Sequence, residues 1–283
     1  MITMRFPGGV KKCLTLSYDD GVRQDKRLVE ILDKHGIKAT FNINSGLFGN
    51  VADKELPNGR MSVEEVKELF GNSPHEVAIH GLYHGWDQTL HSNCMANEIL
   101  EDRKNIEKLF GRIIRGMAYP FGTFNDKLVD CLKTCGIVYS RTTISTERFD
   151  IPEDWLRLPA TTHHRNPKLN ELCDRFLESD IYLPQMFYLW GHSYEFDNNE
   201  EYNNWTVIES FAEKMGGHDD IWYATNIEAY DYIEAYNRLN ISTDETVIHN
   251  PSGIDVWVLR RWRENGDYKY STDCIKAGEI VKF

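Results

Sequence analysis

The sequence predicts an α/β fold in which about seven parallel strands and the helices between them form a distorted, closed or nearly closed barrel. Short apolar segments with the length of buried strands alternate with amphipathic segments along most of the chain. Repeated strand–helix units place the strands parallel, because each helix carries the chain back across the sheet. An open doubly wound sheet is the alternative arrangement of the same units.

The order of the elements follows from the spacing of apolar residues and from helix-starting signals. Leu28, Ile31 and Leu32 share one face of the first expected helix. Ser62 and Glu65 form a capping box for the second. Strands are expected at 13–18, 38–44, 76–79, 116–119, 137–142, 156–160, 186–190 and 221–225. Helices are expected at 24–35, 62–71, 125–135 and 227–239, and a further long helix is expected to end at residue 110.

After about Ile241 the strand–helix alternation stops. Short candidate antiparallel strands follow at 246–248, 256–260 and 268–270, with turn sequences at 250–253 and 265–267. The expected division is therefore a barrel over residues 1–240 and a small β appendage over residues 241–283.

The composition narrows the possible partners. The 283 residues are 41% hydrophobic and 27% charged, which suits one large globular core. A formal net charge of −12 without a long Lys/Arg run argues against nucleic-acid binding. No segment has the length of a membrane span and no signal peptide is recognisable, so no membrane partner and a cytoplasmic location are expected.

Six cysteines without paired CxxC spacing are interpreted as free thiols.

Two adjacent acidic residues, Asp19 and Asp20, follow the first predicted strand directly. Active sites of parallel barrels form at the C-terminal ends of the strands, which is where this pair lies. Like charges side by side disfavour joint ionisation, and a bound cation would remove that cost. A helix N-cap is the alternative interpretation, and it explains one aspartate better than two.

His80 and His84 follow the strand expected at 76–79. If the chain turns helically there, this spacing places both imidazoles on one side, as in helical zinc motifs. His192 follows a later strand; taken alone it would be a packed core histidine, but its place at a strand end favours a functional role. The remaining histidines are expected to be structural or on the surface: His35, His75, His91, His218 and His249.

His163 and His164 are neighbours in the sequence. Adjacent side chains in a strand or turn point apart, so this pair is not expected to bind one metal ion together.

Four segments, in order, resemble the motifs of the polysaccharide deacetylases, also called carbohydrate esterase family 4 or the NodB-homology domain. Ser17-Tyr-Asp-Asp-Gly21 resembles the first motif, T-F-D-D-G, and His80 to His84 resembles the second, H-[ST]-x-x-H. Residues 118–122, Ala-Tyr-Pro-Phe-Gly, partly match the third motif, R-x-P-[YF]-G. Trp190-Gly-His192 resembles the later L-x-H motif. The resemblance implies a NodB-like barrel that ends near residue 238 and leaves the tail uncovered.

The resemblance implies that Asp20, His80 and His84 hold one divalent metal ion. Zn²⁺ is the expected ion, and Co²⁺, Ni²⁺ or others are alternatives for such nitrogen and oxygen donors. No prediction of the oligomeric state follows.

The resemblance further implies the catalytic roles. Asp19 would be the general base, His192 the general acid, and the backbone N–H of Phe121 an oxyanion donor. Substrate contacts are expected from Tyr119, Pro120 and Trp190. The implied activity is hydrolysis of an N-acetyl or O-acetyl group on a carbohydrate or small acetylated substrate. A cation that polarises the carbonyl, with a base and an acid on either side, is chemically suited to that reaction.

Three departures from the motifs indicate a divergent subgroup. Gly81 stands where the second motif has Ser or Thr, so a hydrogen bond near the metal ligand is expected to be lost. Ala118 stands where the third motif has an arginine that would pair with Asp19. A fourth motif, D-x-x-D-W, is matched only by 154–155. Three arginines are candidates to orient Asp19 instead: Arg115, Arg141 and Arg157.

Other functions remain open from the sequence. A hydrolase of a small non-peptide amide could use the same barrel, and an inactive carbohydrate-binding homologue could keep it. Two histidines with one carboxylate also occur in non-haem iron oxygenases, but those usually have antiparallel folds. Retention of both Asp19 and His192 argues against a purely binding role, because binding requires neither an acid nor a base.

Overall fold

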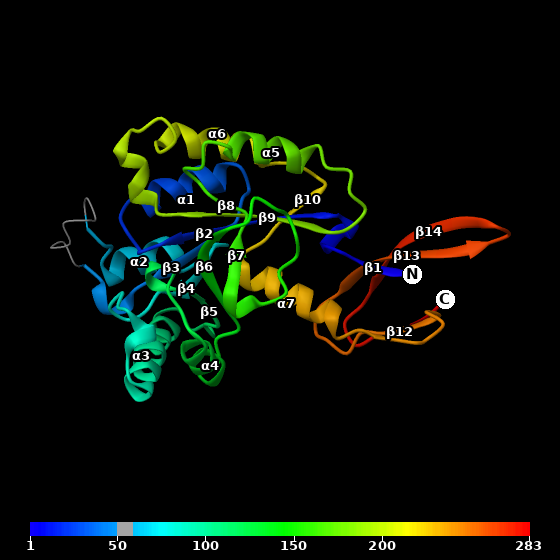
Figure 1. The fold of residues 1–283 in the computed structure, drawn as a ribbon, viewed down its shortest axis with the longest axis horizontal. Coiled ribbons are helices and arrows are strands. Elements are labelled where there is room, and N and C mark those ends of the chain that lie inside the picture. The colour runs from blue at the N-terminus through cyan, green and yellow to red at the C-terminus, as the bar shows by residue number, and fades with distance from the viewer. Residues whose placement is uncertain (50–58) are drawn as a thin grey trace.

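A parallel sheet forms the centre of the molecule. The computed structural model describes residues 1–49 and 59–283. In this part of the chain the sheet has the order β7-β6-β5-β4-β3-β2-β9-β8, and β10 pairs with β2 (Figure 1). The strands are β2 (Lys12–Asp19), β3 (Thr40–Ile43), β4 (Glu76–Ile79), β5 (Gly116–Ala118), β6 (Tyr139–Ser145), β7 (Leu158–Ala160), β8 (Thr162–His163), β9 (Gln185–Gly191) and β10 (Ile221–Tyr223).

The two ends of the sheet meet at one residue. β7 pairs with β6 and β8 pairs with β9, and Thr161 alone separates β7 from β8. The Thr161 N–H donates to the carbonyl of Tyr188 on β9 at 2.9 Å. Residues 158–163 therefore pair with β6 at one edge of the sheet and with β9 at the other. This arrangement confirms the predicted α/β fold with a distorted parallel barrel.

The described ranges contain seven α-helices. Six of them cover the outside of the sheet: α1 (Asp25–Lys34), α2 (Val63–Phe70), α3 (Ser92–Phe110), α4 (Asp126–Thr134), α5 (Leu169–Leu177) and α6 (Trp205–Met215). The seventh, α7 (Asn226–Asn237), packs at one end of the barrel. α1, α5 and α6 lie together on one side (Figure 1). Ser62 and Glu65 form the predicted capping box at the start of α2. None of the helices in residues 1–49 and 59–283 has the length and apolar character needed to cross a membrane.

Side-chain alternation along the strands decides which residues face inward. On β2, Leu14, Leu16 and Tyr18 pack against the outer helices in the larger apolar cluster. The intervening residues Cys13 and Asp19 therefore point to the opposite, inner side. β9 alternates in the same way, with Met186, Tyr188 and Trp190 in the inner cluster and Phe187 and Leu189 in the outer one. This alternation carries Asp19 and His192 to the same interior.

The amino-terminal end of the barrel is closed by the start of α7. Glu76, on β4, accepts hydrogen bonds from the Ile227 N–H at 2.9 Å, the Thr40 hydroxyl at 2.8 Å and the Tyr139 hydroxyl at 2.8 Å. A carboxylate at a helix N-terminus is favoured by the unpaired N–H groups there. Glu76 therefore ties α7 to three strands at the end opposite the predicted site.

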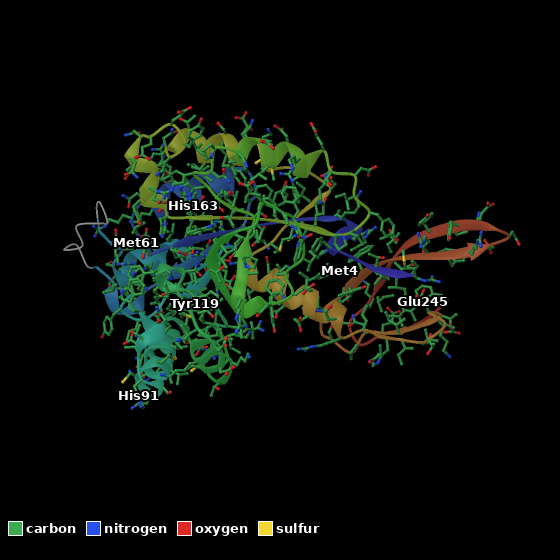
Figure 2. The ribbon with its side chains drawn as sticks, viewed as in Figure 1. Met4, Met61, His91, Tyr119, His163 and Glu245 are labelled. Carbon is green, nitrogen blue, oxygen red and sulfur yellow. The ribbon has the colours of Figure 1, made fainter. Side chains whose placement is uncertain are left out.

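The C-terminal residues form the predicted short antiparallel strands, and the chain's first strand joins them. β1 (Ile2–Arg5) pairs with β13 (Val256–Glu264), which pairs with β14 (Asp267–Ile275). A second small sheet contains β11 (Asn240–Ile241), β12 (Val247–His249) and β15 (Ile280–Lys282). Both lie beside the barrel, and Met4 lies where β1 runs from the barrel to them (Figures 1 and 2). The boundary near residue 240 stays a prediction.

In the barrel, β8, α5 and α6 were not anticipated from the sequence, and in the appendage β1, β11 and β15 were not anticipated either. β8 has two residues, Thr162 and His163, and its apolar pattern is too short to identify a strand. α5 and α6 are amphipathic, with Leu172, Phe176, Ile208 and Phe211 buried. Their apolar spacing was available in the sequence, and both helices could have been found from it.

We predict that Glu76 makes the stability of the fold depend on pH. Burial raises the pKa of Glu76 to about 7, above the value of about 4.3 for an unfolded glutamate. Between these two pKa values the folded state binds more protons than the unfolded state. The free energy of unfolding should therefore fall as pH rises. Urea unfolding between pH 5 and 8 should show a flatter dependence for Glu76→Gln than for wild type. Glu101→Gln, at a half-buried position of α3 that pairs with Lys104, is the control and should follow wild type.

Candidate active site

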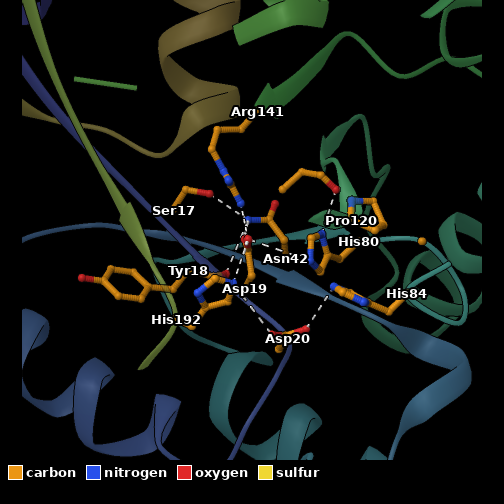
Figure 3. A network of polar contacts seen from close by, with 12 residues as sticks. Ser17, Tyr18, Asp19, Asp20, Asn42, His80, His84, Pro120, Arg141 and His192 are labelled. Atoms are coloured by element: carbon orange, nitrogen blue, oxygen red, sulfur yellow. Dashed lines mark hydrogen bonds and ion pairs between the residues drawn. The ribbon is translucent and has the colours of Figure 1, made fainter. Parts of the chain in front are cut away.

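A pocket of about 320 Å³ lies where the C-terminal ends of β2, β4, β6 and β9 converge. Figure 3 shows the polar groups at its centre. The pocket brings together five of the residues predicted from sequence to bind metal or catalyse: Asp19, Asp20, His80, His84 and His192. Its other lining residues are Arg60, Tyr119, Phe121, Gly122, Arg141, Thr143, Trp190 and Tyr194.

Asp19 is held at the end of β2 by an arginine and an amide. The Arg141 Nη2 atom donates to Asp19 Oδ2, and the pair is almost fully buried. Asn42 Nδ2 donates to Asp19 Oδ1 at 2.8 Å. Burial alone would raise the pKa of Asp19, but Arg141, with His80 and His192, lowers it well below its usual range. Asp19 is therefore an ionised acceptor with a fixed orientation.

The structure selects Arg141 from the three arginines proposed to orient Asp19. Arg115 pairs with Asp231, and Arg157 pairs with Asp126 and Asp154, both outside the pocket.

The position of Arg141 explains why Ala118 can replace the motif arginine. Ala118 on β5 and Arg141 on β6 are direct partners in the strand register. Registered neighbours project on the same face of a sheet, so a guanidinium from either position can enter the same interior. Arg141 also lies over the Trp190 ring, with its Cζ atom 4.3 Å from the ring centroid. The arginine that pairs with Asp19 therefore comes from β6 and not from β5.

Asp20 has an arginine partner that sequence reasoning missed. Arg60 Nη2 donates to Asp20 Oδ1 at 3.1 Å, and Arg60 Nη1 donates to the Asp20 carbonyl and to Asn44 Oδ1. Arg60 reaches the site because it forms a β-bridge with Val22, just after the acidic pair. No motif marks Arg60, and its sequence distance from Asp20 hides this contact. Asp20 itself has a positive φ of 85°, a conformation that aspartate tolerates better than most residues.

His80 and His84 carry lone pairs suited to a metal ion. His80 Nδ1 lies 2.8 Å from the carbonyl of Ala118, so this nitrogen carries the proton and Nε2 is left as the donor atom. Burial lowers the pKa of His80 to about 4 and also lowers the pKa of His84. Both imidazoles are therefore neutral at neutral pH.

The segment between the two histidines is a turn and not the helical turn expected from their spacing. Gly81 has φ 75° and His84 has φ 53°, both in the left-handed region. A Cβ atom on Gly81 would lie 3.0 Å from Asp87 Oδ2 and 3.0 Å from Pro120 Cγ. The Ser or Thr of the family motif would therefore be strained by the positive φ and would crowd Asp87 and Pro120. The buried Asp87 carboxyl occupies the neighbouring position, and burial raises its pKa to about 7.

The donor set fits a divalent cation. Asp20, His80 and His84 each offer one ligand atom, and these atoms lie within 4.8 Å of one another. The Asp20 Oδ1 and His84 Nε2 atoms are 3.7 Å apart. One carboxylate and two neutral imidazoles form a common donor combination for zinc and related ions.

The residues 119–122 form a turn along one side of the pocket. Phe121 has φ 57°, and its N–H donates to no group in residues 1–49 or 59–283. The Phe121 ring is 48% exposed and stacks on Trp86, which is 53% exposed, with ring centroids 4.3 Å apart. Tyr119 is buried and donates to the Leu156 carbonyl, and Pro120 is buried beneath Gly81. Trp190 lines the pocket with 7% exposure.

His192 lies opposite the turn. Its Nε2 atom is 3.8 Å from Asp19 Oδ2 and 4.0 Å from Asp20 Oδ2. Its Nδ1 atom is 3.3 Å from Glu195 Oε2. Burial lowers the pKa of His192, but Glu195, Asp20 and Asp19 outweigh it and raise the pKa above its ordinary value.

The expectation that His163 and His164 point apart was wrong. Their ring centroids are 4.5 Å apart, and both Nε2 atoms face Glu195 Oε2, at 3.2 and 3.4 Å. The chain leaves β8 at His163, so the regular alternation of a strand no longer separates the two side chains.

Comparison with known proteins agrees with this geometry. The family model described as polysaccharide deacetylase matches residues 8–140, and the resemblance predicted from the motifs is confirmed there. Residue 192 lies beyond this match. None of the curated proteins matches the chain.

The chain is similar to solved structures, and the first one described here shares its fold. A proposed polysaccharide deacetylase from Mycobacterium smegmatis is 14% identical, with a TM-score of 0.58, over 83% of this chain and 94% of that one. The Streptococcus pyogenes deacetylase PplD in complex with acetate is 19% identical with a TM-score of 0.41, over 46% of this chain. The chain spans 55% of PplD. A carbohydrate esterase family 4 pseudoenzyme from Bacillus anthracis, BA3943, is 20% identical with a TM-score of 0.47, over 80% of this chain and 67% of that one.

We predict that the arginine can be moved between β5 and β6. Arg141→Ala leaves the buried Asp19 carboxylate unpaired and should destabilise the protein by about 3–5 kcal/mol. Adding Ala118→Arg should recover part of this loss, because the new guanidinium enters from the registered position. Urea unfolding of the single and double variants measures both effects. A double variant no more stable than Arg141→Ala would contradict the interchange. Arg157→Ala, which breaks only surface pairs, is the control and should cost little.

Proposed function

We propose that this protein is a metal-dependent deacetylase that hydrolyses an N-acetyl or O-acetyl group on a carbohydrate. The observation that carries the proposal is the placement of an ionised aspartate and a histidine beside a three-donor cation site in one pocket. Asp19 and His192 face each other across 3.8 Å at its centre, and the ligand atoms of Asp20, His80 and His84 lie next to them. The family resemblance over residues 8–140 supports the same reaction.

Each group has a defined task in this reaction. Asp20, His80 and His84 would hold one divalent ion, with Zn²⁺ expected first, and a bound ion would supply Lewis acidity toward the acetyl carbonyl. Asp19 accepts a proton from the attacking water, and Arg141 and Asn42 keep its carboxylate oriented.

The remaining groups act on the other atoms of the acetyl linkage. The free N–H of Phe121 donates to the carbonyl oxygen as negative charge develops on it. The C–N or C–O bond then breaks, and His192 Nε2 gives a proton to the leaving nitrogen or oxygen.

The rim of the pocket suits a sugar. Phe121 and Trp86 present a stacked pair of exposed aromatic rings next to His84, whose ring centroid is 4.5 Å from that of Phe121. Aromatic faces pack well against the C–H faces of sugar rings, because both are apolar and flat. A small acetylated amide would not need this surface, so we favour a carbohydrate over a small amide as the substrate.

The metal site gives the first test of the proposal. Wild type dialysed against Zn²⁺ and then against buffer should keep about one ion per chain by elemental analysis. His84→Ala should bind Zn²⁺ at least about tenfold more weakly, because one of three ligands is lost. His91→Ala removes an imidazole that lies in neither group of possible metal ligands and is the matched control. Equal zinc affinity in wild type and His84→Ala would refute the assignment.

Acetate release gives the second test. Zinc-loaded wild type should release acetate from a panel of N-acetylated amino sugars, short chito-oligosaccharides or acetylated xylan fragments, and more slowly from small amides. Asp19→Asn and His192→Ala should each lower kcat by about 10²–10⁴-fold while zinc content stays unchanged. Trp86→Ala should raise KM for oligosaccharides and leave KM for small amides unchanged. Release from small amides alone would favour the amidase, and binding of sugars without any release would favour the inactive homologue.

A further inference from the structure

Glu195 lies at the centre of a cluster of nitrogen donors behind His192. Its Oε2 atom is 3.3 Å from His192 Nδ1 and 3.3 Å from the His192 backbone N. The same oxygen is 3.2 Å from His163 Nε2 and 3.4 Å from His164 Nε2. Its Oε1 atom accepts from Arg165 Nη1 at 3.3 Å. Glu195 is 8% exposed, so these protein groups and not bulk water satisfy most of its carboxylate.

The neighbours of each imidazole determine which nitrogen carries the proton. His163 Nδ1 accepts from the Arg165 N–H at 3.2 Å, so His163 Nε2 bears the hydrogen that faces Glu195. His164 Nε2 lies between two acceptors, Glu195 Oε2 and Asn203 Oδ1, the latter at 3.1 Å. It can satisfy them only as an N–H donor. The His163 N–H therefore faces the carboxylate of Glu195, and the His164 N–H donates to Asn203 Oδ1 with Glu195 Oε2 3.4 Å away.

These proton positions argue against a second metal ion in the cluster. His163, His164 and Glu195 lie close enough together to be metal ligands by distance alone. A neutral imidazole binds metal through its unprotonated nitrogen, and in His163 that nitrogen is already occupied by the Arg165 N–H. The cluster is better described as an anion held by surrounding donors.

His192 links this cluster to the pocket. Its Nδ1 faces Glu195, and its Nε2 faces Asp19 and Asp20 at 3.8 and 4.0 Å. A carboxylate that accepts from Nδ1–H fixes the ring and leaves Nε2 to exchange a proton with a bound substrate. Gly191 makes the arrangement possible, because a Cβ atom there would lie 1.9 Å from His164 Nδ1.

We propose that Glu195 is a positioning residue that pins His192 through Nδ1, and that His163, His164 and Arg165 hold Glu195 in place for this task. The inference rests on the proposed function, because it assigns Glu195 to proton donation at the leaving group. In that step water oxygen bonds to the carbonyl carbon, the C–N bond breaks, and its electron pair stays on nitrogen. The nitrogen then takes the proton from His192 Nε2. Glu195 neither gains nor loses a proton and touches no substrate atom.

The role can be tested by changing the leaving group. An amine must be protonated as it leaves, but 4-nitrophenolate leaves without a proton. Glu195→Gln should therefore lower kcat for an N-acetylated amino sugar by about a hundredfold or more. It should change kcat for 4-nitrophenyl acetate by less than about threefold, with zinc content and the KM for the amino sugar unchanged. Equal losses on both substrates, or no loss on the amide, would overturn the proposal.

A matched control removes another carboxylate of the same region. Glu147 pairs with Asn166 and Lys168, and no imidazole in residues 1–49 and 59–283 forms a hydrogen bond or ion pair with it, so Glu147→Gln should retain wild-type kcat on both substrates. Zinc bound beyond one ion per chain in wild type, and lost in Glu195→Gln, would instead make the cluster a metal site and overturn the proposal.

A measurement on the unmodified protein avoids dependence on the folding of a variant. In ¹⁵N-labelled wild type, two-bond nitrogen–proton correlations report which imidazole nitrogens carry protons. His192 should be protonated at Nδ1, and His163 should be protonated at Nε2. A His192 ring without a proton on Nδ1 would overturn the proposal. If wild type released acetate from no substrate, the proposed function would fail, but this spectrum would still decide the positioning by Glu195.

Discussion

Two adjacent buried carboxylates, Asp19 and Asp20, set the main constraint on the site. Two like charges in a protein interior are unstable unless positive groups compensate for them. Arg141 from β6 pairs with Asp19, and Arg60 pairs with Asp20. The formal charges of these four side chains cancel, so the site is neutral before any cation binds. A divalent ion would make it positive, which suits the negative charge that develops on an acetyl oxygen during hydrolysis.

The fold and the central site residues could be predicted from local sequence patterns. Strands with apolar outward residues, such as Leu14 and Leu16 on β2, are visible as short buried segments. The acidic pair and His80, His84 and His192 follow such segments directly, and the structure brings all of them to one pocket. Their convergence follows from parallel topology alone, because the C-terminal ends of parallel strands lie at the same end of a barrel.

The partners of these residues could not be predicted, because they depend on register and on contacts distant in sequence. Arg141 was one of three candidates, and it pairs with Asp19 because the strand register places it opposite Ala118, which the sequence does not reveal. Arg60 comes from a segment 40 residues beyond Asp20, with no motif to mark it. Glu195 follows His192 by three residues, a spacing that was visible. The orientation of His163 and His164 toward Glu195 required knowledge of where β8 ends.

The pairing of β1 with β13 has a consequence for the order in which the chain can fold. Ile2 is registered with Arg260, so β1 needs a partner that is synthesised about 250 residues later. At about 5–20 residues per second, β1 would emerge from a ribosome roughly ten to fifty seconds before β13 exists. During that interval its hydrogen-bonding groups lack their final partner, as on any exposed strand. The barrel strands β2, β3 and β4 are synthesised one after another and are neighbours in the sheet. They can therefore pair before β13 is available to β1.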